Sequence, residues 1–312
     1  MSRGIVFMAS FAFAHVLLLV QRAVGINWDF HPDAVMYIEE FDRYTDGWSG
    51  VPNNVYYYLS ALFRGSAWAL LEVNIAVYSL TNAIGYAFIL EKSKEIGLSR
   101  KVTVVLTATF LIQVYRAHLA IHVLKDTLVI AALLAVVILG FRRGFFAFVL
   151  LVLLRVSSII YLSVFLRRKG LLIVGLFLVF SVFLMPQELS QFISSRNEAD
   201  MGGRDSDTVP NFSEYGQEGS FIRAVLWPLL LLTGGFFVLS PGFMFFPIAL
   251  ELLVARIGQL YVRSFGASFV AVMFALSAIA ITVNSFTAFL RYGYPLVALW
   301  PILFVSAYGV RR

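Results

Sequence analysis

Long apolar runs alternate with short polar segments along the whole chain. Many of these runs approach the roughly 20 residues that an α-helix needs to cross the hydrocarbon core of a bilayer. The pattern predicts an all-α, polytopic transmembrane bundle of about eight to ten spans. The ten runs are Ile5–Ala23, Ser66–Leu90, Val102–Val114, Thr127–Phe141, Phe145–Leu166, Leu171–Leu184, Phe221–Leu239, Phe243–Val262, Ala267–Val283 and Pro295–Val310.

The composition supports this interpretation. Hydrophobic residues make up 60% of the 312 residues and charged residues only 13%, and the mean hydropathy is +0.84. Soluble domains carry roughly 25% charged residues, and a soluble fold of this size could not hide so much apolar surface. We therefore predict a single integral membrane domain over residues 1–312. Its first apolar run is expected to be a retained span rather than a cleaved signal peptide.

Several kinds of chemistry have no residues to carry them. The sequence contains no cysteine, which excludes disulfides, thiolate metal sites and cysteine nucleophiles. It also lacks a His-Glu-x-x-His zinc helix, a Gly-x-Ser-x-Gly elbow and a phosphate loop of the Gly-x4-Gly-Lys type. The net charge of +6 does not indicate nucleic acid, because the basic residues mostly lie between apolar runs.

The charges between the runs predict an orientation. Residues 24–65 contain six acids and residues 187–220 contain seven, out of 18 in the chain. Basic residues cluster instead at 92–101, 142–143, 167–169 and 311–312. Lys and Arg mark cytoplasmic loops. We therefore expect both termini in the cytoplasm and both acidic loops outside, in a multi-pass protein of the inner (cytoplasmic) membrane.

One segment allows two topologies. If Phe145–Leu166 spans once, the basic residues at 167–169 fall outside. If it dips in and returns, with Arg155 at its turn, every basic cluster stays cytoplasmic, and Phe243–Val262 must also enter and leave by one side. The charge distribution favours the re-entrant version.

Polar groups at membrane depth are costly and usually mark a function or a paired structural site. The first such cluster lies just after the first run, in residues 27–37. Pro32 suits the first turn of a helix, which would place Asp33, Tyr37 and Glu40 along one face. A carboxylate beside a membrane cavity can act as a general base, so Asp33 and then Asp29 are the catalytic candidates. The alternative is a solvated acidic loop.

The second cluster covers residues 115–127. His118, His122 and Asp126 share one helical face if the helix is continuous, so a metal site is geometrically open. Arg116 and Lys125 would repel a cation, however, and are better suited to a phosphate or pyrophosphate. We therefore predict anion binding here and no cofactor, with a divalent metal as the open alternative. Basic residues at a helix end also snorkel for structural reasons.

Two further arginines complete the polar set. Arg155 lies within an apolar run and needs an anionic partner, either a protein carboxylate or a bound phosphate. Arg291 lies in the turn before the last run, beside Tyr292, where it can contact either lipid headgroups or a substrate phosphate.

These motifs resemble those of known membrane enzymes. The Asp-Ala-x-x-Tyr stretch at Asp33–Tyr37 resembles the outer first loop of glycosyltransferases with the GT-C architecture. Leu124–Thr127 resembles the Lys-Asp motif of bacterial O-antigen and exopolysaccharide polymerases. Leu154-Arg155 and the Arg-Tyr-x-x-Pro sequence at Arg291–Pro295 also look like that set. The motifs are short but extend from end to end. The chain lacks the large soluble C-terminal domain of some GT-C enzymes.

The resemblance implies an enzyme that transfers sugar at the extracytoplasmic face, from a polyprenyl-phosphate or polyprenyl-pyrophosphate donor, in bacterial surface polysaccharide synthesis. Single-sugar transfer and repeat-unit polymerisation both remain open. Its expected partners are the polyprenyl-linked sugar, membrane lipid and other polysaccharide-assembly membrane proteins, and not nucleic acid. The catalytic candidates are Asp33 and Asp29, the phosphate-binding candidates Arg116, Lys125, Arg155 and Arg291, and the supporting residues His31, Tyr37, His118, His122, Asp126 and Tyr292.

Two rival functions use the same residues. A lipid-linked-sugar flippase or transporter would guide the anionic headgroup with the same arginines and need no catalytic carboxylate. Such proteins often contain internal repeats, and none is evident here. A scaffold subunit would use Arg155 only as a paired charge within the bundle.

Overall fold

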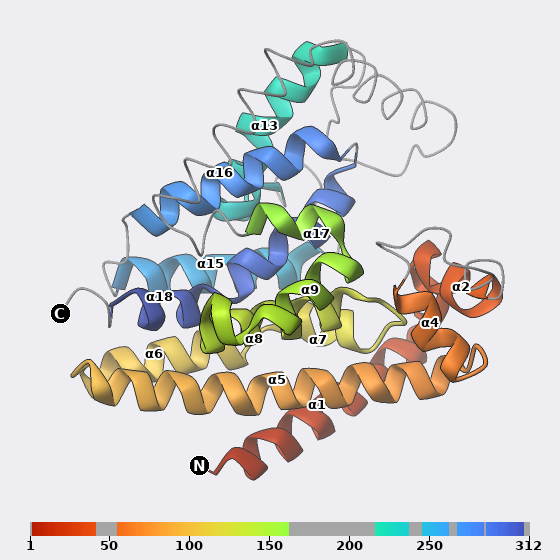
Figure 1. Cartoon of the computed structure of the whole chain (residues 1–312), viewed down its shortest axis with the longest axis horizontal. Coiled ribbons are helices and arrows are strands. Elements are labelled where there is room, and N and C mark those ends of the chain that lie inside the picture. Colours follow the sequence, from red (N-terminus) through yellow and green to blue (C-terminus); the bar gives the residue numbers. More distant parts are fainter. Residues whose placement is uncertain are drawn as a thin grey trace. The chain divides into compact units, whose positions relative to one another are not determined.

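A computed structural model describes residues 2–41, 55–161, 216–236, 245–261, 267–283 and 285–308. Every secondary-structure element in these ranges is a helix, and no strand occurs among them (Figure 1). This confirms the all-α prediction. The expected run Leu171–Leu184 and most of the second acidic loop, at 187–215, lie outside the described residues.

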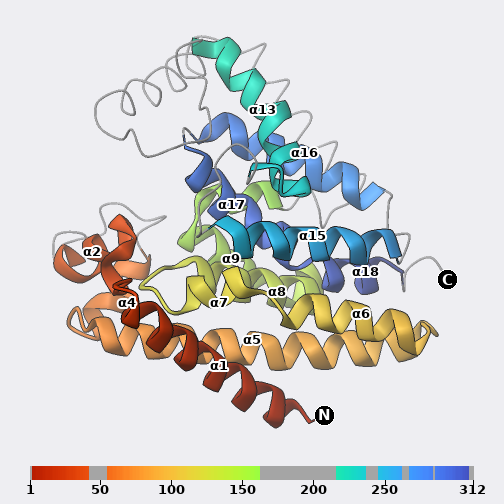
Figure 2. The ribbon, with the colours of Figure 1, turned by 180° about the vertical axis from the view of Figure 1, so that it is seen from behind.

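The chain forms two compact units. The first unit comprises Met1–Val156 and Ala298–Arg312. Its central helix, α5 (Ala67–Glu95), packs against most of the other helices of the unit, and α2 and α4 lie at one end of it (Figures 1 and 2). The other helices of this unit are α1 (Arg3–Ala23), η1 (Trp28–Phe30), α2 (Pro32–Glu39), α4 (Val55–Leu62), α6 (Arg100–Leu111), α7 (Val114–Ala120), α8 (Asp126–Arg143), α9 (Phe145–Leu154) and α18 (Trp300–Tyr308).

The second unit comprises Ser157–Val297. Within it, α13 packs on α16 and α15, and Trp227 of α13 contacts the rings of Phe286 and Phe289 at centroid distances of 5.6 and 5.5 Å. Aromatic packing therefore joins α13 to the helix that carries Arg291. The helices of this unit are η2 (Val156–Tyr161), α13 (Gly216–Thr233), α15 (Phe245–Tyr261), α16 (Ala267–Thr282) and α17 (Phe286–Ala298).

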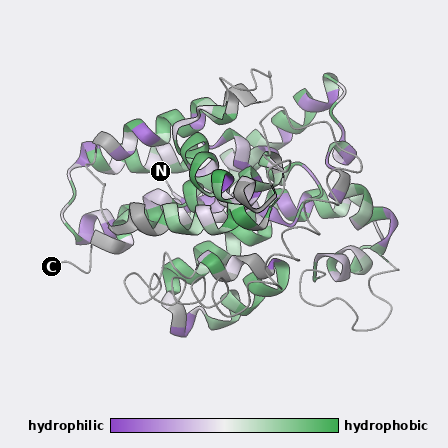
Figure 3. Cartoon of the chain, turned by 90° about the horizontal axis from the view of Figure 1, so that it is seen from above, coloured by the Kyte–Doolittle hydropathy of each residue, from purple (hydrophilic) through white to green (hydrophobic). Residues whose placement is uncertain are grey.

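Four helical stretches are long and apolar enough to cross a membrane: Arg3–Ala23, Ala67–Glu95, Arg100–Ala120 and Ala288–Ser306. Four other apolar helices in the described ranges have 10–17 residues. Hydrophobic residues run along the lengths of the helices, and hydrophilic residues lie mainly at their ends and turns (Figure 3). The structure therefore supports a helical membrane-associated protein, with four full-length candidate spans among the described residues.

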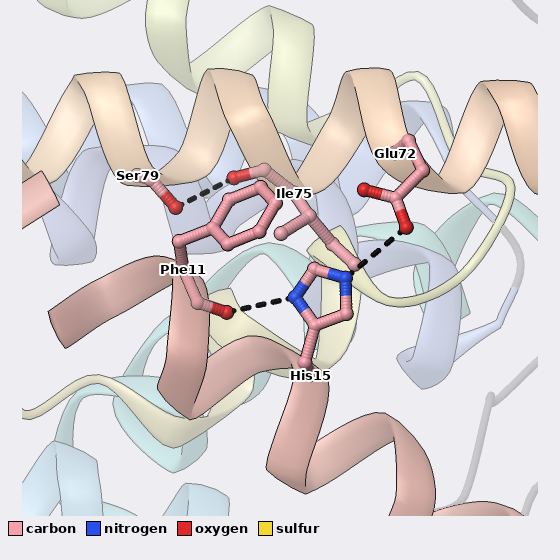
Figure 4. Close-up of polar contacts among 5 residues, drawn as sticks. All are labelled: Phe11, His15, Glu72, Ile75 and Ser79. Carbon is pink, nitrogen blue, oxygen red and sulfur yellow. Dashed lines mark hydrogen bonds and ion pairs between the residues drawn. The ribbon is translucent and has the colours of Figure 1, made fainter. Parts of the chain in front are cut away.

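Helix α1 runs antiparallel to α5, and polar contacts join the two helices along their length. The ring of His15 connects them at one point (Figure 4): its Nδ1 lies 2.9 Å from the carbonyl oxygen of Phe11, and its Nε2 lies 3.1 Å from a carboxylate oxygen of Glu72. Interhelical hydrogen bonds help helices associate where the surrounding lipid is as apolar as the side chains. The joined pairs are Arg3–Glu91, Ser10–Asn82 and His15–Glu72.

Three of the long helices begin at a serine cap. The hydroxyls of Ser2, Ser66 and Ser99 accept hydrogen bonds from backbone N–H groups three residues later, at 3.3, 3.4 and 3.3 Å. A serine at this position satisfies one of the free N–H groups of the first turn. These caps explain why α1, α5 and α6 begin where they do.

Some of the expected continuous runs are interrupted. Helix α7 ends at Ala120, and α8 begins only at Asp126. The prediction that His118, His122 and Asp126 share one helical face is therefore wrong, because a turn separates the histidines from the aspartate. Helix α8 contains Gly140 at φ 71°, a left-handed conformation that favours glycine. Helix α9 ends at Leu154, and Arg155 is extended.

Candidate functional site

Three histidines from distant parts of the sequence meet in the first unit. Each of His31, His118 and His122 offers a ring nitrogen, and these atoms all lie within 4.8 Å of one another. His31 precedes the first turn of α2, His118 lies in α7, and His122 lies in the turn before α8. All three side chains are buried. We refer to these three residues as the histidine cluster.

The amide of Gln21, near the end of α1, connects two of these rings. Its nitrogen lies 3.0 Å from Nδ1 of His118, and its oxygen lies 3.0 Å from Nε2 of His122. The Nε2 atoms of His31 and His118 are 3.1 Å apart. In this arrangement His118 carries its proton on Nε2 and donates it to His31, an assignment made from the network itself. His122 donates from Nε2 and keeps a lone pair on Nδ1.

The ring of His122 is held in its neutral form. His122 lies outside the four candidate spans, yet burial lowers its pKa to about 4. The backbone of Trp28 and of Asn27 and the carboxylate of Asp29 act in the opposite direction. Nδ1 of His122 is buried and has no hydrogen-bond partner. The neutral imidazole is therefore the form present at neutral pH.

The turn that carries His122 is fixed to the central helix. The fully buried Asn74 of α5 donates its amide to the carbonyl oxygens of His122 and Leu124, at 2.9 and 3.0 Å. Val123, between them, packs into an apolar cluster with Tyr37 and Tyr56. Both the backbone and the side chains of the turn are therefore held, which fixes the position of His122.

Helix α2 carries the predicted catalytic residues. It begins at Pro32, as the sequence predicted. The ring of Tyr37 lies 4.6 Å from that of Tyr56, measured between centroids, and its carbonyl oxygen accepts a hydrogen bond from Ser60. Asp33 lies in the first turn of the helix and is partly buried. Packing of α2 against α4 therefore fixes the helix that carries Asp33, which follows His31 of the histidine cluster by two residues in sequence.

The preceding turn covers the cluster with an aromatic ring. The ring centroid of Phe30 lies 5.1 Å from that of His31, 6.3 Å from that of His118 and 5.8 Å from that of His122. Asp29, next to Phe30, is exposed. The first polar cluster (residues 27–37) therefore lies directly against the turn of the second (residues 115–127).

Asp126 pairs with Arg155 instead of joining the histidines. Nη2 of Arg155 lies 2.6 Å from Oδ1 of Asp126, and their side chains are 3% and 0% exposed. The anionic partner that the sequence required for Arg155 is therefore a protein carboxylate in this structure. Lys125 immediately precedes the first residue of α8 and is partly buried.

Arg116 is directed toward α5 and α6. Its guanidinium donates to the side chain of Asn82 and, at 2.8 Å, to the carbonyl oxygen of Phe110. It also lies over the rings of Phe110 and Tyr78, at 4.3 and 5.5 Å from their centroids. Although Arg116 is only two residues from His118 in sequence, its charge is therefore held by groups on α5 and α6.

The fourth predicted cluster belongs to the second unit. Arg291 is buried in α17, and the carbonyl oxygen of Tyr292 accepts a hydrogen bond from the hydroxyl of Tyr161. In the first unit, by contrast, the structure brings the first cluster against the second and joins the second to Arg155.

Several buried or partly buried polar residues were not among the predicted site residues. Gln21 and Asn74 organise the histidine cluster, and Asn82 contacts Arg116. In the second unit, the fully buried Arg223 contacts Ser220 at 2.9 Å, and Glu251 accepts a hydrogen bond from Tyr294. Each of these residues lies within or at the edge of an apolar run. A polar residue in such a run often marks a function or a paired structural site, so their position could have identified them.

The comparisons with known proteins add no relative. No family model matches the chain, and neither a curated protein nor a solved structure matches it. The chain is therefore characterised by its own sequence and structure, as an all-helical protein with apolar helices suited to a membrane.

Proposed function

We propose that the chain is an integral membrane glycosyltransferase of the GT-C type. It would use a polyprenyl-phosphate- or polyprenyl-pyrophosphate-linked sugar at the extracytoplasmic face of the cytoplasmic membrane, in the synthesis of a bacterial surface polysaccharide. Both termini would be cytoplasmic, and the acidic loop that carries Asp33 would be outside.

One observation carries this proposal: the loop with Asp29 and Asp33 packs against the turn that leads to Lys125. The contact is made by His31, whose Nε2 lies 3.1 Å from that of His118 in α7 and whose ring centroid lies 4.9 Å from that of His122 in the turn. A carboxylate and a cation that are about 90 residues apart in sequence are thereby held on two packed segments of one unit. Base catalysis and anion binding both require such an arrangement.

In the proposed reaction, Asp33 takes the proton of the acceptor hydroxyl as that oxygen forms a bond to the anomeric carbon of the sugar. The bond between this carbon and the phosphate oxygen breaks, and the polyprenyl phosphate or pyrophosphate leaves. Lys125 would stabilise the charge on the leaving group, an effect that is large in a low-dielectric site. Arg116 would contribute if a donor phosphate replaced its contacts with Asn82 and Phe110. Arg155 would contribute if a donor phosphate shared it with Asp126. Arg291 lies in the second unit, and phosphate binding by it stays a separate prediction.

The local geometry at Arg155 supports the re-entrant topology within this proposal. Helix α9 ends at Leu154 after 10 residues, and the chain is extended at Arg155. Ten helical residues span about 15 Å, roughly half of the hydrocarbon core. A segment that turns back at Arg155 would keep the basic residues at 167–169 on the cytoplasmic side.

Substitution of Asp33 tests the catalytic role. The full chain is reconstituted in liposomes with a radiolabelled polyprenyl-diphosphate sugar and a glycan acceptor, and Asp33→Asn is compared with Glu39→Gln. Glu39 is an exposed carboxylate on the same helix, outside the site. We expect Asp33→Asn to lower the transfer rate by about 100-fold or more and Glu39→Gln to leave it unchanged.

The same assay separates the rival functions. Product formed at the wild-type rate by Asp33→Asn would remove the base from the mechanism. Translocation of the labelled lipid without product would identify a flippase. Neither product nor translocation, from a protein whose thermal unfolding is intact, would contradict both and leave a scaffold.

A further inference from the structure

We infer that His31, His118 and His122 form a binding centre for a zinc ion. This inference does not depend on the proposed sugar transfer. It rests on the meeting of three buried imidazoles inside the first unit and on the groups that surround them.

The spacing of the ring nitrogens matches what zinc requires. Zinc binds imidazole nitrogens at about 2.0–2.1 Å in tetrahedral geometry, which places the ligand atoms about 3.3–3.4 Å from one another. The Nε2 atoms of His31 and His118 are 3.1 Å apart, and all three ligand atoms lie within 4.8 Å. One pair of nitrogens thus already has nearly the required spacing, and ring rotations that bring the third nitrogen closer would complete three corners of a tetrahedron.

The ligand chemistry selects the class of metal. Neutral imidazoles suit zinc and its transition-metal neighbours, whereas magnesium and calcium prefer oxygen ligands. Nδ1 of His122 is a buried acceptor without a hydrogen-bond partner, and leaving such an atom unsatisfied costs free energy. A cation bound to Nδ1 would remove that cost.

Gln21 is placed to orient the ligands. When His118 binds through Nε2 and His122 through Nδ1, their other ring nitrogens both carry protons. Both of these nitrogens already lie 3.0 Å from the Gln21 amide, whose oxygen has two lone pairs and can accept from both once the amide has turned. Such outer partners fix the tautomer of a zinc-bound histidine.

The charges around the cluster also permit a dication. Asp29 is close enough to act electrostatically on His122. The guanidinium of Arg116 is held by Asn82 and Phe110, on α5 and α6. The ring of Phe30 contacts all three imidazoles edge-on or at a tilt. The centre would therefore have three histidine ligands and a fourth position for Asp29 or for an oxygen of water or substrate.

The test is metal binding by the purified full-length chain in detergent, without any sugar substrate. The protein is stripped with a chelator and titrated with Zn²⁺ by calorimetry, and Co²⁺ is used as a spectroscopic substitute. We expect one Zn²⁺ per chain and the strong visible absorption of tetrahedral Co²⁺.

The variants use the chain's own histidines as matched controls. The sequence has four histidines, and His15 lies outside the cluster, on α1. His122→Ala and His118→Ala should each abolish stoichiometric binding, and His15→Ala should bind as the wild type does. Gln21→Glu should tighten binding by about 10- to 100-fold, because a carboxylate accepts from both rings, and Gln21→Met should weaken it by a similar factor.

Three results would overturn the inference: no Zn²⁺ bound by the wild type at micromolar concentration, equal loss in His15→Ala and His122→Ala, or Mg²⁺ binding in place of Zn²⁺. Metal-free thermal unfolding of each variant shows whether lost binding reflects lost structure. If His122→Ala unfolds, Gln21→Glu and Gln21→Met still decide the matter through opposite shifts in affinity. Because no donor lipid is present, a negative result here is distinct from failure of the proposed transferase activity.

Discussion

At the scale of single residues, the ion pair of Arg155 and Asp126 is the contact whose loss we expect to cost the most stability. Its atoms lie 2.6 Å apart and both side chains are almost fully buried. Removing one member of such a pair leaves a charge in a low-dielectric interior, whereas replacing both with apolar residues is often nearly neutral. The pair therefore sets a test of local stability that is separate from catalysis.

We predict that Asp126→Leu alone destabilises the protein by about 3–5 kcal/mol. The double variant Asp126→Leu, Arg155→Met should recover most of that loss, because no unpaired charge remains. Unfolding in detergent, followed by circular dichroism against temperature or denaturant, measures both. If the double variant is as unstable as the single one, the ion pair is not the source of the effect.

Single residues also show the limit of what the sequence could predict. The need of Arg155 for an anionic partner follows from its apolar surroundings alone. The identity of that partner, 29 residues away, does not. His31 and His118 are 87 residues apart, and no periodicity connects a loop residue to a distant helix. Charged and polar residues could thus be singled out by sequence, but not paired.

At the scale of helices, the sequence predicted the long helices better than the places where they are interrupted. The expected runs Ile5–Ala23 and Ser66–Leu90 correspond to α1 (Arg3–Ala23) and α5 (Ala67–Glu95). The sequence does not reveal whether the polar segment between two apolar runs continues a helix, so the turn between α7 and α8 was missed. That turn depends on Asn74, a tertiary contact from another helix.

Close packing of α5 on α6 provides a test at this scale. A Cβ atom added at Gly85 would collide with the ring of Phe110, which is fully buried. We expect Gly85→Ala to destabilise the protein by about 1–3 kcal/mol, because overpacking forces backbone or ring shifts. Gly4→Ala, in open surroundings on α1, is the control and should be neutral or slightly stabilising.

Thermal unfolding of both glycine variants in detergent gives the comparison. Adding Phe110→Leu to Gly85→Ala should restore part of the stability if the ring is the obstacle. Equal melting temperatures for Gly85→Ala and the wild type would show that α6 moves away from α5 at little cost.

At the scale of the whole molecule, the length of α5 bears on which side of a membrane its polar ends face. Helix α5 has 29 residues and is therefore about 43 Å long, more than the roughly 30 Å of a hydrocarbon core. Its two ends can reach opposite surfaces. Sequence composition sufficed to predict a helical membrane protein, but two compact units arise from tertiary packing that hydropathy does not encode.

The absence of cysteine makes the topology directly measurable. Single substitutions at the exposed positions Glu39→Cys, Lys94→Cys and Arg143→Cys are treated with a membrane-impermeant maleimide. We expect Glu39→Cys to react in intact spheroplasts and the other two only after permeabilisation. Reaction of Lys94→Cys from outside would reverse the orientation proposed here, and with it the side on which Asp33 acts.

The polar contacts between α1 and α5 have a consequence for the far end of α1. Arg3, Ser10 and His15 meet Glu91, Asn82 and Glu72 in order along the two helices. A slip of α1 by one turn, about 5.4 Å, would break all of these pairs together and draw Gln21 away from His118 and His122. Apolar helix faces in lipid offer little resistance to sliding along one another. These polar pairs therefore fix the axial position of α1 on α5, and with it the position of the Gln21 amide beside the rings of His118 and His122.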